Sequence, residues 1–175
     1  MEDSMRNRFC LYLFALLLAV PAVCAQDVSD SNTVDCNFDE NRQLAVEYQK
    51  TPPSKRPVLG RDVPYDRVWA PGGKPMTLFV STPVSLEGHS LPLGAYTMFV
   101  VPSEKKWKLI ISKSTDTSGK YDEKDDILRA TMDMGELAHP ENQFSVFFGH
   151  VAPNECALRF ELDKVGAFAT FEAKK

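Results

Sequence analysis

Apolar and polar side chains alternate with a period of two along most of the chain. The sequence LRFELD at 158–163 alternates apolar and charged residues, and LRATMDM at 128–134 does the same. Such alternation predicts β-strands with one buried face and one solvated face. Residues 96–101 and 144–148 are apolar on both faces, which is typical of central strands in a sandwich.

Short clusters of Gly, Pro, Asn and Ser separate these segments, as in hairpin connections. No window shows a convincing helical period, and the best helix candidate is one turn at 136–139, cut by Pro140. We therefore predict an all-β fold, an antiparallel β-sandwich or partly closed barrel of about eight or nine short strands. The predicted strands are 44–48, 76–81, 84–87, 95–101, 107–112, 128–134, 143–149, 157–162 and 168–172.

A long loop interrupts the strand pattern between residues 55 and 74, where proline and glycine recur too often for a helix or a long strand. A loop of this length in a compact domain is usually functional or packed by its own side chains. Val63, Tyr65, Val68 and Trp69 supply such packing groups.

The first 25 residues have the layout of a secretory signal peptide, with two arginines before an apolar run at 9–20. The run is too short to cross a membrane, which needs about 20 residues. Val23-Cys24-Ala25 fits a cleavage site that leaves Gln26 first, and a lipidated Cys24 is the alternative. We expect a secreted or periplasmic protein with no membrane span.

Residues 26–41 are polar, and their composition predicts a flexible arm. Residues 42–175 then form a single β-sandwich domain, a length that supports one core. The formal net charge of −4 argues against nucleic acid, because phosphate binding needs clustered Lys and Arg. The lysines at 105, 106, 108 and 113 are scattered among strands and turns.

Two cysteines remain after signal cleavage, Cys36 and Cys156. An exported protein meets an oxidising compartment, so we predict a disulfide between them, with two unrelated thiols as the alternative. No second Cys or His stands at zinc-ligand spacing.

Motifs for catalysis and metal binding are weak. The segment GHSLP at 88–92 lacks the second glycine of a nucleophile elbow, and the three histidines are far apart in the sequence. An acidic loop contains Asp116, Asp122, Glu123, Asp125 and Asp126, but Lys120 falls at a calcium-ligand position. We therefore expect no metal and no cofactor, and the catalytic residues stay unknown.

Several separated motifs resemble the bacterial exported family catalogued as domain of unknown function 2911. The motifs are PYDRVW at 64–69, GAYTMFVVP at 94–102, WKLIISK at 107–113, YDEKDD at 121–126 and Arg129. The resemblance implies an exported β-rich domain and names no substrate. In that family an Arg and an Asn typically follow the tryptophan, whereas this chain has Ala70-Pro71-Gly72-Gly73-Lys74.

We expect a non-catalytic module that binds a small molecule, a glycan or an envelope protein through the two long loops. The candidate ligand-binding residues are Tyr65, Trp69, Lys113, Tyr121, Asp122, Asp126 and Arg129. Aromatic rings on loops can stack on a sugar, although packing is their commoner role, and an Arg paired with an Asp can equally be a structural tie. The alternatives are a carbohydrate hydrolase that uses loop carboxylates and a purely structural domain.

Overall fold

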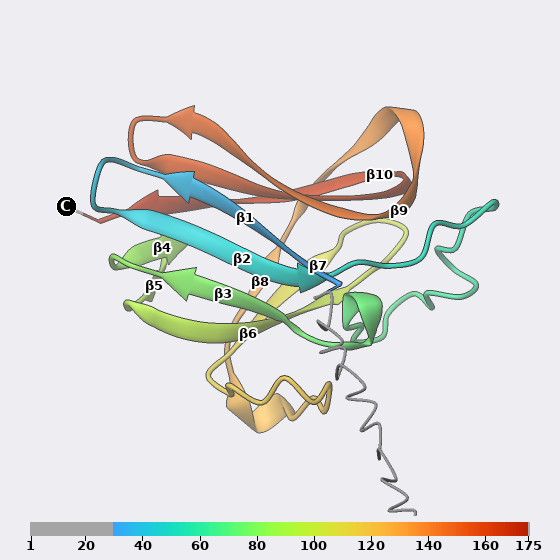
Figure 1. Ribbon diagram of the computed structural model, residues 1–175, viewed down its shortest axis with the longest axis horizontal. Helices are drawn as coiled ribbons and strands as arrows, with labels where there is room; N and C mark the ends of the chain where they lie inside the picture. Colours follow the sequence, from blue (N-terminus) through green and yellow to red (C-terminus); the bar gives the residue numbers. More distant parts are fainter. Residues whose placement is uncertain (1–29, 175) are drawn as a thin grey trace, which may run out of the picture.

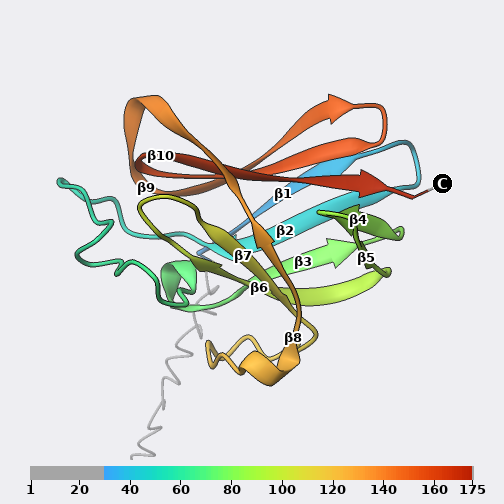
Figure 2. The same cartoon turned by 180° about the vertical axis from the view of Figure 1, so that it is seen from behind.

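The computed structural model describes residues 30–174, and the predicted signal peptide and its cleavage site lie outside this part of the chain. Two antiparallel sheets face each other (Figures 1 and 2). The six-stranded sheet has the order β1-β2-β3-β6-β7-β8, and the four-stranded sheet has the order β5-β4-β10-β9. This confirms the predicted all-β sandwich, and the sheets do not close into a barrel.

The strands follow the predicted positions with a few differences. In chain order they are β1 Ser31–Asn37, β2 Gln43–Gln49, β3 Met76–Val80, β4 Val84–Leu86, β5 His89–Leu91, β6 Gly94–Val101, β7 Lys108–Ser112, β8 Asp126–Thr131, β9 Asp133–Ala152 and β10 Glu155–Ala173. Two short 3-10 helices, η1 Pro71–Gly73 and η2 Glu123–Asp125, interrupt the long loops. No helix in the described residues is long and apolar enough to cross a membrane.

The predicted flexible arm at 26–41 is wrong for residues 31–37. These residues form β1, which pairs with β2 from Ser31↔Gln49 to Asn37↔Gln43. Cys36 is buried and forms the predicted disulfide with Cys156 of the opposite sheet. Main-chain pairing and this covalent tie order a segment whose side chains are mostly polar.

The predicted helical turn at 136–139 is also wrong, because these residues belong to the long strand β9. β9 and β10 form a bent hairpin, and β10 doubles back on itself (Figure 1). Asp163, near the middle of β10, has a positive φ of 52°. The amide of Ala173 at the end of β10 donates to the carbonyl of Asn154 at its start, at 2.8 Å. β10 thus crosses the four-stranded sheet twice.

The core lies between the two sheets. Trp107, Phe144, Phe160 and Phe171 are its largest fully or almost fully buried side chains. The prediction that 144–148 is buried on both faces is wrong for Phe147, which is 47% exposed on the outside of the four-stranded sheet.

Candidate functional site

The second long loop, at 113–125, packs on the outer face of the six-stranded sheet, the face turned away from the other sheet. The first long loop instead reaches both sheets, because its Trp69 pairs with Val100 of β6 and its Val58 and Leu59 amides donate to Asp163 of β10. Phe99 and Ile110 point to the outer face, yet they are 3% and 0% exposed. Tyr121 covers Phe99 edge-on, with ring centroids 5.1 Å apart. The loop at 113–125 also meets η1 so closely that a Cβ on Gly119 would lie 2.9 Å from the carbonyl oxygen of Gly73. The 113–125 loop therefore forms a second packed layer over part of the outer face and touches η1 of the first loop.

A β-bulge in β8 places Asp126 in this layer. Ile111 pairs with Leu128, but Ser112 pairs with Asp126, so Ile127 is an extra residue between them. A bulge redirects the side chains next to it. The side chain of Asp126 is only 10% exposed as a result.

Asp126 is the centre of a hydrogen-bonded cluster with Tyr121 and Arg129. Its Oδ2 accepts from the Tyr121 hydroxyl at 2.6 Å and from Arg129 Nε at 2.7 Å. Arg129 also donates to the Tyr121 hydroxyl at 2.5 Å and to Glu123 at 3.0 Å. Burial, together with the bond to Asp126, raises the pKa of Tyr121 to about 12, so this hydroxyl stays protonated at neutral pH.

Two buried oxygens near this cluster have no hydrogen-bond partner within the described residues, namely Asp126 Oδ1 and Thr97 Oγ1. Leaving a buried polar atom unpaired costs about 1–3 kcal/mol, and such atoms are uncommon in folded proteins. Both oxygens are closed off from solvent in this structure.

Strand register aligns Thr97 and Asp126 with further polar residues across five strands of the outer face. Each member of this row pairs with the next on the neighbouring strand. The row consists of Glu47, Thr77, Thr97, Ser112 and Asp126. We call it the polar row.

A cavity of about 260 Å³ opens at the Glu47 end of the polar row, where the two loops meet. Lys74 and Pro75 line it from the first loop, and Thr117 lines it from the second. Its remaining lining residues are Glu47, Tyr48, Gln49 and Thr77 from β2 and β3. We refer to it as the loop cavity.

The seven candidate residues from the sequence are only partly brought together. Tyr121, Asp126 and Arg129 form one cluster, as described above. Lys113 lies on the same loop, with its Nζ 3.7 Å from Asp125, and Asp122 caps η2 by accepting from the amide of Lys124 at 3.0 Å.

Tyr65 and Trp69 lie apart from this cluster. Trp69 packs edge-on against Phe144, with ring centroids 5.2 Å apart, and its backbone pairs with Val100. Tyr65 lines a separate shallow groove with Ser103, Glu104 and other neighbours. Trp69 thus has a packing environment in the core.

The residues of the loop cavity were not among the sequence candidates. The sequence does contain a signal for the polar row, because Thr97 and Ser112 are polar residues inside otherwise apolar strands, and the structure buries them to 1% and 2% exposure. Among the described residues, Cys36, His150 and Cys156 are the one group close enough to hold a metal, and the two sulfurs are already bonded to each other.

Comparison with known proteins identifies one family. The family model described as "Protein of unknown function (DUF2911)" matches residues 29–170. No curated protein and no solved structure matches the chain.

Proposed function

The chain belongs to the DUF2911 family, and we propose that it is a non-catalytic module that binds a small neutral polyol, such as the end of a glycan, in the loop cavity. The observation that carries this proposal is that the two long loops meet over a polar hollow. Long loops held on a rigid sheet are the usual carriers of binding residues.

The chemistry of the lining favours a neutral ligand rich in hydroxyl groups. Glu47 and Lys74 contribute opposite charges, so their formal charges sum to zero and select neither an anion nor a cation. The Gln49 amide and the hydroxyls of Thr77 and Thr117 are donors and acceptors at once. A sugar needs both kinds of group around each hydroxyl. The volume of about 260 Å³ lies below the range of drug-sized ligands and suits one small ring.

The loop carboxylates give less support to the alternative of a carbohydrate hydrolase. Asp126 and Glu123 both bind Arg129, Asp125 lies near Lys113, and Asp122 caps η2. A glycosidase needs a carboxylic acid with a raised pKa. Asp116 has the opposite shift, because hydrogen bonds from the backbone and side chain of Ser118 hold its pKa below the ordinary value.

A location outside the cytoplasm is consistent with the Cys36–Cys156 disulfide, since such bonds persist in oxidising compartments. This supports our proposal that the protein is secreted or periplasmic. The ligand would then be a glycan or a small molecule of the cell envelope or the medium.

The proposal is tested by calorimetric titration of the protein with a panel of monosaccharides and short oligosaccharides. Glu47→Gln replaces a charged carboxylate of the loop cavity with a neutral amide, and Thr117→Val removes a hydroxyl from it. Thr115→Val makes the same change as Thr117→Val on an exposed neighbour that does not line the cavity. We expect Glu47→Gln to weaken binding about tenfold, because a hydrogen bond to a charged group contributes about 1.5 kcal/mol or more, and Thr117→Val to weaken it about fivefold, because an ordinary hydrogen bond contributes about 1 kcal/mol. Thr115→Val should bind like the wild type.

Two results would contradict the proposal. One is a panel on which no sugar binds, and the other is binding that Glu47→Gln and Thr117→Val leave unchanged. Release of reducing ends from a bound oligosaccharide would favour the hydrolase instead.

A further inference from the structure

One edge of the four-stranded sheet lacks the usual protection against pairing. Sheet edges expose unpaired backbone groups, and proteins shield them with charges, prolines or very short strands. The other edges here follow this rule, because β8 carries Asp126 and Arg129, β1 carries Asp35, and β5 has three residues. β9 differs, since residues 142–149 contain no charged residue and no proline.

The edge-facing backbone groups of β9 can be identified from their neighbours. The carbonyl of Asn142 accepts from the amide of Ser54 at 2.6 Å, and the amide of Phe144 donates to Thr51 Oγ1 at 2.8 Å. Both groups point away from β10, so the even-numbered residues face the edge. The next ones, Val146 and Phe148, are paired with no further strand among the described residues.

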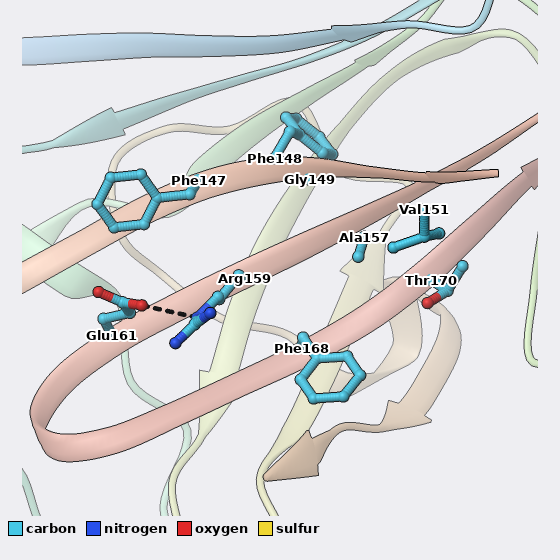
Figure 3. Close-up of a pocket in the computed structure, with 9 residues that line it drawn as sticks. All are labelled: Phe147, Phe148, Gly149, Val151, Ala157, Arg159, Glu161, Phe168 and Thr170. Atoms are coloured by element: carbon cyan, nitrogen blue, oxygen red, sulfur yellow. Dashed lines mark ion pairs between the residues drawn. The ribbon is translucent and has the colours of Figure 1, made fainter. Parts of the chain in front are cut away.

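Apolar side chains stand on the outer surface of the same strand. Phe147 and Val151 are 47% and 56% exposed, and Phe168 on the returning limb of β10 is 39% exposed. They line a groove of about 450 Å³ with the Arg159–Glu161 ion pair, whose atoms are 2.6 Å apart. Figure 3 shows Phe147, this ion pair and Phe168 on successive passes of the chain.

We propose that β9 pairs antiparallel with β9 of a second copy of this chain, around a twofold axis at Phe147. A twofold axis there places Val146 opposite Phe148 of the second copy, and the edge groups of both residues can then form four backbone hydrogen bonds. Residues 145–149 then face the same five residues of the second copy, and none of them is charged, so there is no like-charge repulsion between them. The four-stranded sheets of the two copies then form one continuous sheet, and the twofold symmetry limits the assembly to a dimer.

The two Phe147 side chains form the central pair of this arrangement. They occupy a non-hydrogen-bonded position, where opposing Cα atoms are about 4.5 Å apart and side chains are closest. Aromatic pairs across strands stabilise a sheet. Contact with Phe147 of the second copy explains why this side chain is exposed in the single chain.

The test is sedimentation equilibrium of the oxidised protein at about 1 to 500 µM, the range suited to a small, weak interface. We expect a concentration-dependent dimer, and we expect Phe147→Glu to weaken it at least tenfold, because it replaces an aromatic pair with two facing like charges. Phe79→Glu is the matched control, since Phe79 is 44% exposed on the other sheet. It should leave the dimer intact, and circular dichroism would verify that both variants fold.

Phe168→Glu separates edge pairing from stacking of the two outer surfaces. Phe168 lies away from the free edge, so edge pairing predicts little change, whereas stacking of the grooves predicts the same loss as Phe147→Glu. As a direct readout, Phe147→Cys should form an intermolecular disulfide under mild oxidation, because about 4.5 Å lies within the Cα distance range of disulfides. Phe168→Cys should not. A monomer at all concentrations, an unchanged dimer in Phe147→Glu, or equal losses in Phe147→Glu and Phe168→Glu would overturn the proposal.

Discussion

Removal of the Cys36–Cys156 disulfide should destabilise the domain strongly and loosen β1 first. The bond joins β1 at the edge of the six-stranded sheet to β10 of the other sheet, with a Cα–Cα distance of 6.3 Å. β1 has one hydrogen-bonded neighbour, β2, so the disulfide is its direct covalent link to the four-stranded sheet. The double variant Cys36→Ala/Cys156→Ala removes this link.

The magnitude follows from the length of the closed loop. The two cysteines are 120 residues apart. By the loss of chain entropy in the unfolded state, a loop of that length stabilises the folded state by about 5 kcal/mol. For a domain of roughly 150 residues the unfolding entropy is about 0.3 kcal/mol/K, so the Tm should fall by roughly 15 °C.

The assay compares oxidised wild type, reduced wild type and the double variant by denaturant unfolding and thermal melts. Reduced wild type is the matched control, because it keeps both side chains and lacks only the bond. A chelator is needed, since His150 and both sulfurs lie within 4.8 Å of one another and could hold a metal once the thiols are free. Hydrogen exchange should show faster exchange of β1 amides than of β6 or β7 amides. A loss of less than about 1 kcal/mol, or unchanged protection in β1, would refute the reasoning.

Three further predictions concern the loops. Asp163→Ala should lower the free energy of unfolding, measured in urea, by about 2 kcal/mol, because Asp163 Oδ2 accepts from the amides of Val58 and Leu59 at 2.9 and 2.8 Å. Asp163→Asn keeps an acceptor oxygen and should lower it less, whereas equal losses in the two variants would contradict this role of Asp163. The pKa of Tyr121 is about 12 in the folded protein against an ordinary value of 10.0, so this hydroxyl loses its proton first in the unfolded chain, and stability should fall as the pH rises from 10 to 12. Tyr121→Phe should reduce this fall, and a pH profile of stability that the variant leaves unchanged would contradict the prediction. Trp69→Ala should cost about 3 kcal/mol through lost packing on Phe144 and leave sugar binding unchanged in the folded protein, whereas weakened binding would place Trp69 in the ligand site.

The strand pattern was readable from the sequence because side chains alternate between faces in any extended segment. The segments 76–81, 95–101, 128–134 and 157–162 all contain or overlap strands of the structure. The disulfide was also predictable, since only two cysteines follow the predicted signal peptide. Neither inference needed knowledge of which strands are neighbours.

β1 escaped the same reasoning because its order depends on partners far away in the chain. Its sequence SNTVDCN contains few apolar residues, so composition alone predicted disorder. Hydrogen bonds to β2 and the bond to Cys156 supply what its side chains do not. The exposure of Phe147 was hidden for a related reason, because an apolar run does not reveal whether its second face is covered.

Some residues of the candidate site were predictable from the sequence and others were not. Tyr121, Asp126 and Arg129 are close in sequence, and they were recognised as candidates before their contacts were known. The polar row and the loop cavity were not predictable, since Glu47, Thr77 and Thr97 become neighbours only through the strand order β2-β3-β6. The sequence by itself determined where most of the strands lie and which side chains of a strand share a face, because both follow from local backbone geometry. Only the tertiary structure decided which strands lie side by side, because that order depends on contacts between distant parts of the chain.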